Sequence, residues 1–169
     1  MAAKIIIDGK EFDLGIRALT DFANSLSDYP QFRGLFDQLA LTQASEIRAM
    51  MAYKDNISPN VVKVLLQDRS VEVLKAAVRN THAKKELTTE ELIALINLDD
   101  RELTDNIINS IEEYENADSL AISEHIISLN NKQHLHSLAD YRYVPKKVLK
   151  LLSKNSDPDI QSAALRSLD

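Results

Sequence analysis

Residues 58–68 and 70–80, which read SPNVVKVLLQD and SVEVLKAAVRN, carry the clearest fold signal in the chain. Ser58 can cap a helix, and Pro59 suits the first helical turn, where the missing backbone N–H costs nothing. Apolar residues at helical spacing follow in both segments: Val62, Leu65 and Leu66 in the first, and Val73, Ala76, Ala77 and Val78 in the second. Adjacent alanines let two helix axes approach closely. The stretch therefore predicts a packed pair of short amphipathic helices.

The same pattern recurs at residues 144–168, which read VPKKVLKLLSKNSDPDIQSAALRSL. In the first helix, Pro59, Val62, Leu65 and Leu66 correspond to Pro145, Val148, Leu151 and Leu152. In the second helix, which follows a one-residue insertion, Val73, Ala76, Ala77 and Arg79 correspond to Ile160, Ala163, Ala164 and Arg166. This recurrence predicts a second helical pair of the same kind, with Leu151 in its apolar stripe.

Helix-start signals recur along the chain at a nearly constant interval. They fall at Pro30, Pro59, Thr89, Ser119 and Pro145, which are separated by 29, 30, 30 and 26 residues. A period of about 30 residues with two helices in each period is typical of a solenoid, in which each repeat packs only on its neighbours. The predicted fold class is therefore all-α, an α-α superhelix of about five helical pairs. We expect a single domain over residues 1–169, with helical repeats over 16–169.

The N-terminal segment has a different pattern. Residues 4–14 read KIIIDGKEFDL, in which three β-branched residues precede Asp8-Gly9, the dipeptide that a type I′ hairpin turn favours. An isolated hairpin is marginally stable in water, so we expect residues 1–15 to lie against the first helices as a β-hairpin cap. A helix is predicted over about 16–27.

The composition excludes several classes of protein. The 169 residues include no cysteine and three glycines, which excludes disulfide frameworks, Cys-ligated zinc and iron–sulfur sites, and leaves no glycine-rich phosphate-binding loop. The formal net charge of −6 disfavours general binding to nucleic acid or to anionic membranes. The sequence shows neither a signal-peptide pattern nor an apolar run near the length of a membrane span, so we expect a soluble cytoplasmic protein that has no membrane partner.

Two helical repeat families resemble parts of this chain. Residues 157–168, DPDIQSAALRSL, resemble the second-helix pattern of short HEAT-like repeats, and residues 54–80 and 141–164 are similar to the leucine-rich repeat variant. Both resemblances imply an all-helical solenoid whose motifs specify a fold and carry no chemistry. The HEAT-like resemblance further implies that the second helices of the repeats line the concave binding face.

Acidic residues are concentrated in one part of the chain. Residues 86–142 contain thirteen acidic and three basic side chains, whereas the flanking segments are slightly basic. On the helix that begins near Asp100, a predicted buried stripe of Leu103, Ile107, Ile111 and Tyr114 leaves the polar side chains on the opposite side. The candidate partner-binding residues are Glu102, Asp105, Asn109, Glu112 and Glu113. They predict a docking surface for a protein or peptide with a basic segment. The alternative is that these acids only keep the protein soluble.

Nothing in the sequence indicates catalysis or metal binding. His134 and His136 are two residues apart, which places them on different helix faces, and HExxH, GxSxG and EF-hand patterns are missing from the sequence. The serines lie near helix ends, where capping explains them. We therefore expect a non-enzymatic scaffold that uses neither a cofactor nor a metal.

Two other functions remain open. A HEAT-like DNA-binding protein or DNA glycosylase would use basic residues, for which the candidates are Arg79, Lys84, Lys85, Lys146, Lys147, Lys150 and Lys154. A regulatory subunit would bury its terminal repeat against a partner, through an apolar surface near Leu165 and Leu168. Tyr141 and Tyr143 flank a predicted turn, where an exposed ring could anchor an interface.

Overall fold

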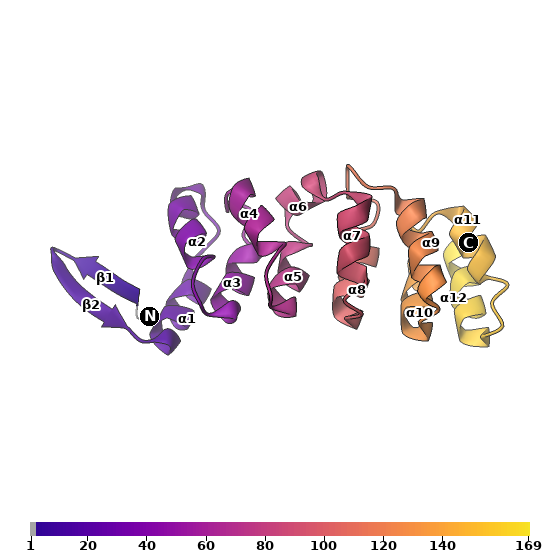
Figure 1. Ribbon diagram of the computed structural model, residues 1–169, viewed down its shortest axis with the longest axis horizontal. Coiled ribbons are helices and arrows are strands. Elements are labelled where there is room, and N and C mark those ends of the chain that lie inside the picture. The colour runs from indigo at the N-terminus through magenta and orange to yellow at the C-terminus, as the bar shows by residue number, and fades with distance from the viewer. Residues whose placement is uncertain (1–2) are drawn as a thin grey trace. The chain divides into compact units, whose positions relative to one another are not determined.

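The computed structural model describes residues 3–169 and divides the chain into two compact units, one that ends at His82 and one that spans Ala83–Asp169. Helices dominate both units, as the sequence predicts, and the boundary between the units falls inside one short helix, α6 (Thr81–Glu86). Figure 1 shows the order of the elements along the chain.

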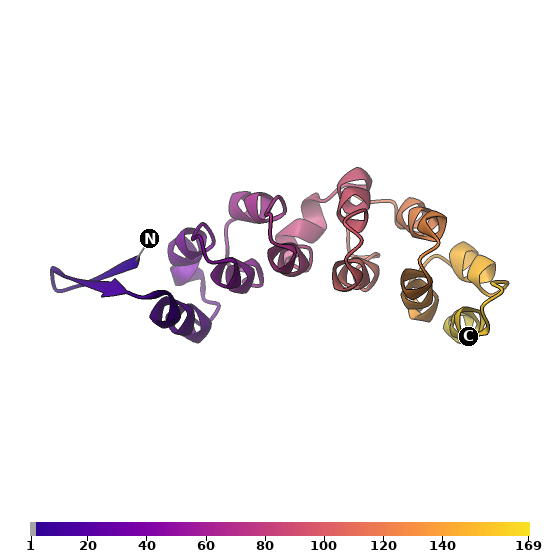
Figure 2. The same ribbon diagram turned by 60° about the horizontal axis from the view of Figure 1, so that its bottom comes forward.

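Unit 1 contains a hairpin followed by helices in two rows. Its elements are β1 (Ala3–Ile7), β2 (Lys10–Leu14), α1 (Ile16–Ser25), the 3₁₀ helix η1 (Pro30–Phe32), α2 (Arg33–Leu39), α3 (Ser45–Ala52), α4 (Pro59–Leu65) and α5 (Val71–Ala77). Helix α3 packs against α1 and α5 in one row, and α2 and α4 pack against it from the other (Figure 2). The core between the rows includes Phe36, Ile47, Met51, Leu65 and Val73, which are all buried.

The predicted hairpin is present, but its role as a cap is not confirmed. The strands pair antiparallel with Ile6 opposite Glu11, and the turn residues Asp8 and Gly9 have φ values of 49° and 77°, as a type I′ turn requires. Ile6 is 67% exposed and Phe12 51% exposed. The second strand, which reads KEFDL, contains only Phe12 and Leu14 as apolar residues between charged ones, so it offers little apolar surface to bury against α1. Residues 1 and 2 of the predicted cap lie outside the described residues.

Unit 2 repeats the two-row arrangement. Its helices after α6 are α7 (Thr89–Ile96), α8 (Arg101–Ile108), α9 (Ser119–Leu129), α10 (Lys132–Asp140), α11 (Lys146–Leu152) and α12 (Pro158–Leu168). Helices α7, α9 and α11 pack in sequence along one row, and α8, α10 and α12 pack along the other (Figure 2). Each helix also contacts its partner in the same pair, so that α7 packs on α8, α9 on α10 and α11 on α12.

Side-chain caps explain where most helices of unit 2 begin. Thr88 accepts a hydrogen bond from the backbone N–H of Glu91, whose carboxylate accepts one from the Thr88 N–H, which makes a capping box. Asp100, Asp118, Asn131 and Asp157 each accept a hydrogen bond from a backbone N–H in the first turn of α8, α9, α10 and α12 respectively. The predicted helix starts near Pro30, Pro59, Thr89, Ser119 and Pro145 are confirmed to within a few residues.

Two details of the sequence prediction are wrong. The helix that begins at Asp100 ends at Ile108, so Glu112 and Glu113 lie in the turn beyond it, although the predicted stripe from Leu103 to Tyr114 is buried. Asn109 and Ser110 favour turns over helix interiors, and a bond from the Ser110 N–H to the Ile107 carbonyl tightens the last turn. Leu151 is 56% exposed, whereas the corresponding Leu65 is 1% exposed.

Polar side chains connect helices that lie one repeat apart. In unit 1, Lys54 donates to the carbonyl of Leu26 and Asn80 donates to the carbonyl of Ala52, each across 28 residues. In unit 2, Thr89 accepts from the N–H of Asp118 across 29 residues. The period of about 30 residues in the sequence therefore corresponds to contacts between successive helical pairs within each unit.

Candidate functional site

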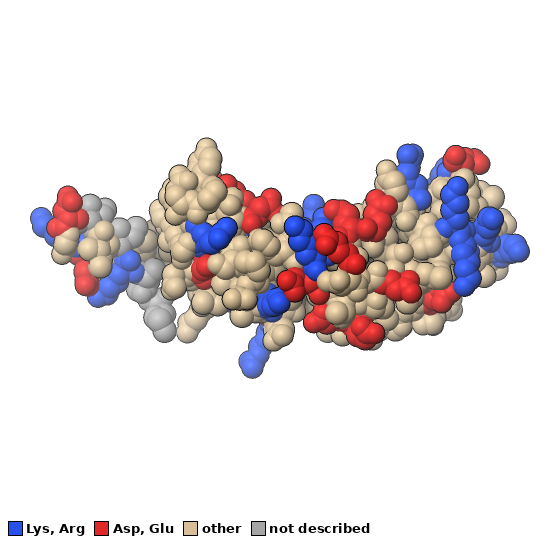
Figure 3. Space-filling view, turned by 90° about the horizontal axis from the view of Figure 1, so that it is seen from above, with Lys and Arg blue, Asp and Glu red and all other residues tan. Residues whose placement is uncertain are grey.

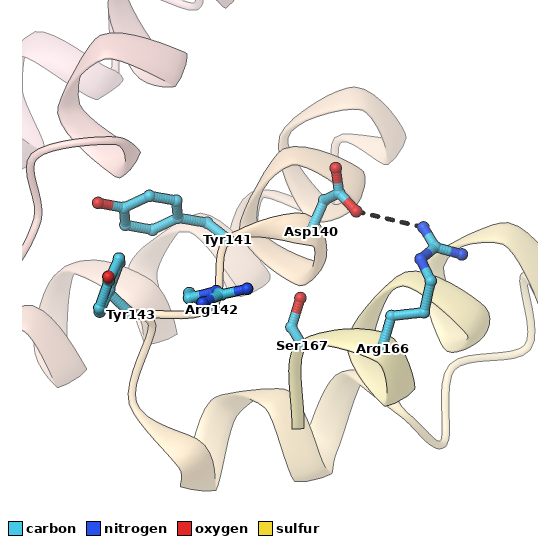
Figure 4. Close-up of a pocket in the computed structure, with 6 residues that line it drawn as sticks. All are labelled: Asp140, Tyr141, Arg142, Tyr143, Arg166 and Ser167. Atoms are coloured by element: carbon cyan, nitrogen blue, oxygen red, sulfur yellow. Dashed lines mark hydrogen bonds and ion pairs between the residues drawn. The ribbon is translucent and has the colours of Figure 1, made fainter. Parts of the chain in front are cut away.

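The second helices of the pairs in unit 2 form two adjoining pockets. A pocket of about 470 Å³ lies between α8 and α10 and is lined by Arg101, Asp105, Asn109, His136, Ser137, Asp140 and Tyr141. A pocket of about 420 Å³ lies between α10 and α12 and is lined by Asp140, Tyr141, Arg142, Tyr143, Arg166 and Ser167 (Figure 4). Asp140 and Tyr141 line both pockets, so the two form one continuous candidate site on this row of helices.

Asp105 is one of two acidic side chains that line the α8–α10 pocket, the other being Asp140. Asp105 is the fifth residue after the helix cap, and its Oδ2 lies 3.5 Å from Nε of Arg101, one helical turn earlier. Its Oδ1 is buried and has no hydrogen-bond partner, although 26% of the side chain is exposed. A carboxylate oxygen that has lost water without gaining a donor costs free energy, and a donor supplied by a ligand would recover it.

The end of α10 carries the aromatic side chains of the site. The hydroxyl of Tyr141 donates to the backbone carbonyl of Asn109 at 2.7 Å, which joins α10 to the end of α8. The rings of Tyr141 and Tyr143 meet edge to face with their centroids 5.5 Å apart, and Tyr143 is exposed (Figure 4). An exposed tyrosine held by a neighbouring ring is typical of an interface anchor.

Charged side chains of both signs line the pockets beside Tyr141: the acidic Asp105 and Asp140, and the basic Arg101, Arg142 and Arg166. Burial raises the pKa of Tyr141, and the negative charges of Glu112 and Glu113 raise it further. Asp140 pairs with Arg166 at 3.2 Å on the other side of the pocket (Figure 4). The field of Glu112 and Glu113 therefore reaches the rim of the site even though neither residue lines it.

The structure separates the five predicted binding residues. Asp105 and Asn109 line the α8–α10 pocket. Glu112 and Glu113 lie in the turn after α8, where Glu113 forms an ion pair with Lys84 at 2.8 Å. Glu102 is exposed near the start of α8 and does not line the pocket.

Sequence reasoning missed Asp140, Ser137, Arg101 and His136 as members of this site. Two of them, His136 and Asp140, occupy the positions in α10 that Asp105 and Asn109 occupy in α8. Asp105 and His136 both lie five residues after a helix cap, and Asn109 and Asp140 both lie nine residues after one. An alignment of the repeats from cap to cap would have placed them side by side.

Much of the acidity of residues 86–142 serves the fold itself. Glu91, Asp100 and Asp118 cap helices, while Asp105, Glu113, Glu124 and Asp140 form ion pairs. Lys84, Lys147 and Arg166, which lie outside this acidic segment, supply the cations for three of those pairs. In unit 2, Figure 3 shows acidic side chains gathered over the part that contains α7 and α8, and basic ones over the C-terminal helices.

Two fully buried polar side chains lie on the helices that form the α8–α10 pocket. Thr104 on α8 and His134 on α10 are buried, and neither Oγ1 of Thr104 nor Nδ1 of His134 has a hydrogen-bond partner. His136 is exposed, which confirms that the two neighbouring histidines lie on different faces of α10. Within residues 3–169, the His, Asp and Glu side chains form no group of three that could hold a metal ion.

No protein-family model matches the chain, and neither a curated protein nor a solved structure shows significant similarity to it. Among the described helices, none has the length and apolar character needed to cross a bilayer. Function is therefore inferred from the chemistry of the two pockets and of the surfaces around them.

Proposed function

We propose that this chain is a non-enzymatic, cytoplasmic protein-interaction module whose helical pairs form a HEAT-like solenoid. Support for the solenoid comes from the packing of alternate helices in two rows inside each unit. It also comes from polar side chains that bond to the preceding repeat 28 or 29 residues away. In such a fold each repeat is stabilised mainly by its neighbours, and the second helices are available for binding.

The partner we propose is a polypeptide with a basic segment. The observation that carries this proposal is the unpartnered Oδ1 of Asp105 in the pocket between α8 and α10. Rotation of the Asp105 side chain would bring this buried oxygen to the pocket, where a lysine or arginine of the partner would donate to it and form a charge-assisted hydrogen bond. The acidic charges of Glu112 and Glu113 at Tyr141 would favour the approach of the same cation.

The two tyrosines give the proposed site an apolar contact as well. Tyr143 is exposed beside Tyr141, at the point where the two pockets adjoin. Aromatic side chains near the centre of an interface carry much of its binding energy, while charged pairs fix the register of the partner. The proposed ligand is therefore an extended segment that places a cation at Asp105 and an apolar side chain at Tyr143.

The experiment compares two variants of equal net charge. The site variant carries Asp105→Asn and Asp140→Asn, and the control carries Glu90→Gln and Glu115→Gln, which are exposed side chains outside both pockets. A partner is captured with the wild-type protein from nuclease-treated lysate, and its basic segment is then titrated against each form. We expect the site variant to bind the basic segment at least about tenfold more weakly, because the partner loses its charge-assisted hydrogen bond to Asp105. The control should bind with the affinity of the wild type. Equal binding by both variants would refute the site.

A second candidate function is a subunit whose C-terminal helical pair is covered by a partner. Helices α3, α5, α8 and α10 are the second helices of the preceding pairs, and in each of them the eighth residue after the helix cap is buried. These residues are Ala52, Val78, Ile108 and Ala139. The equivalent residue of α12, Leu165, is exposed. Leu165→Lys would disrupt an assembly formed through this face, and sedimentation at increasing concentration would detect the change. This candidate function is rejected if the wild-type protein is monomeric at all concentrations and if the Leu165→Lys variant captures the same partners as the wild type.

A further inference from the structure

A basic surface on α11 has no role in the site described above. Lys146, Lys147, Lys150 and Lys154, which we call the lysine face, are all exposed. At 3.6 residues per turn, Lys146, Lys147 and Lys150 span about 100° of the circumference of α11, so they project from one side, and Lys154 follows in the turn after the helix. Lys147 pairs with Glu124 of α9 at 3.0 Å. In the described part of the chain, the ammonium groups of the other three lysines have no partner.

An exposed leucine lies beside these lysines. Leu151 lines a pocket of about 270 Å³ together with Glu124, Lys147, Val148, Lys150 and Lys154. The buried Val148 forms part of the same lining, so the pocket combines apolar carbon with cations at its edges. None of these residues belongs to the α8–α10 or α10–α12 pocket.

Helix stability does not account for the lysine face. Lys146 and Lys147 are the first two residues of α11, where the positive end of the helix dipole disfavours cations, and the first turn has no acidic residue. The only ion pair of the face joins two exposed side chains, and such pairs contribute little to stability. Three of the four lysines are therefore available to pair with a ligand.

We propose that the lysine face binds an acidic polypeptide segment that places an apolar side chain on Leu151. Carboxylates of the segment would pair with Lys146, Lys150 and Lys154, and its apolar side chain would cover the exposed leucine. Unit 2 as a whole contains sixteen acidic and ten basic residues, which would repel an extended polyanion such as nucleic acid. A phosphate backbone also offers no apolar group to Leu151. A short acidic segment avoids both difficulties.

The test uses the full chain and a short fluorescent peptide, rich in glutamate and containing one leucine, together with a version in which serine replaces that leucine. Fluorescence anisotropy gives the affinity of each peptide. Lys150→Glu with Lys154→Glu should weaken binding by about tenfold or more, because two attractive pairs become repulsive. The charge-matched control, Lys10→Glu with Lys85→Glu, changes exposed lysines elsewhere and should leave the affinity unchanged.

Leu151→Ser isolates the apolar contact. Because the side chain is exposed, the substitution should leave the fold intact, which circular dichroism checks. We expect Leu151→Ser to weaken binding of the leucine-containing peptide several-fold and to leave the affinity for the serine-containing peptide unchanged. The proposal is overturned if neither peptide binds at low salt, or if Leu151→Ser affects both peptides equally. It is also overturned if a duplex or single-stranded oligonucleotide binds more tightly than the leucine peptide, which would assign the lysine face to nucleic acid.

Discussion

His134 is a histidine at a position that other repeats fill with aliphatic side chains. The third residue after the helix cap is Ile47 in α3, Val73 in α5, Leu103 in α8 and Ile160 in α12, and all of them are buried. His134 occupies this position in α10, where its Nδ1 has no hydrogen-bond partner. The histidine therefore places an unsatisfied polar atom in the core beneath the proposed binding site.

His134→Leu is expected to stabilise the protein. Removing a buried unsatisfied nitrogen should raise the free energy of unfolding by about 1–3 kcal/mol, since leucine and isoleucine already fit the equivalent positions. Chemical denaturation followed by circular dichroism measures the change, and His136→Leu is the control because that side chain is exposed on the same helix. A loss of stability in His134→Leu would mean that the imidazole has a partner in solution, such as a buried water.

Arg48 and Asp68 form the most enclosed ion pair described in unit 1. Nε and Nη2 of Arg48 lie 2.6 and 2.8 Å from the two carboxylate oxygens of Asp68, with side chains 18% and 10% exposed. Nη1 of the same guanidinium donates to the backbone carbonyls of Thr42 and Gln43. Hydrogen bonding to Arg48 holds the pKa of Asp68 below its usual range.

The lowered pKa of Asp68 makes the stability of unit 1 depend on pH. A carboxyl group whose pKa is lower in the folded state stabilises that state above its unfolded pKa of about 4, and this contribution is lost as the pH falls through the folded pKa. Asp68→Asn should cost about 3 kcal/mol at neutral pH, because it leaves the arginine without its counterion. Urea unfolding at several pH values should show a smaller acid-induced loss in Asp68→Asn than in wild type. Asp21→Asn, at an exposed site, should behave like wild type.

At the scale of the element, the capping box of α7 sets where that helix begins. The hydroxyl of Thr88 and the carboxylate of Glu91 satisfy each other's backbone N–H groups. Thr88→Ala should lower the free energy of unfolding by about 1 kcal/mol, since a first-turn N–H loses its acceptor. Thermal denaturation can measure this change against Glu90→Gln, an exposed neighbour that makes no cap. A loss as large for Glu90→Gln would show that first-turn charge, and not the cap, stabilises the helix.

The first helices of the pairs differ in which apolar residues they bury. Leu65→Ala should cost about 2–5 kcal/mol because the side chain is fully buried in unit 1. Leu152→Ala should cost a similar amount in unit 2, whereas Leu151→Ala should change the stability by less than about 0.5 kcal/mol because its side chain is exposed. Denaturant midpoints of the three variants test the assignment. A large effect of Leu151→Ala would mean that this leucine is covered in solution.

At the scale of the whole molecule, the chain contains two compact units, each with buried apolar residues of its own. Residues such as Ile47, Met51 and Leu65 form the core of the first, and Leu92, Leu103 and Ile122 form part of the second. Because contacts in a repeat protein are local in sequence, each unit should retain structure without the other. A fragment that contains unit 2 should begin at Thr81, the first residue of α6, because the boundary between the units falls inside that helix.

A fragment of residues 81–169 is expected to fold on its own. It should show a helical circular dichroism spectrum and a cooperative thermal transition, since it contains the whole core of unit 2. Leu103→Ala within the fragment is the control and should lower its melting temperature, because it opens a cavity in that core. A fragment that is helical but melts without cooperativity would show that unit 2 needs unit 1 for its packing.

Features that depend on residues close together in the chain can be predicted without the tertiary structure. The helix starts at Pro59, Thr89 and Ser119 and the Asp8-Gly9 turn follow from caps, periodicity and backbone preference, and all of them are confirmed. These signals act over a few residues, so they can be recognised without the tertiary structure.

Only the tertiary structure decided how the polar residues are used. The sequence marks residues 86–142 as acidic, but the cation that pairs with Glu113, Glu124 or Asp140 lies 23 to 29 residues away and on another helix. Packing between successive repeats also decides that Asp105 lines a pocket and that Leu151 is exposed. Local periodicity does not predict which side chains are exposed or line a pocket, because the neighbours that determine this belong to the next repeat.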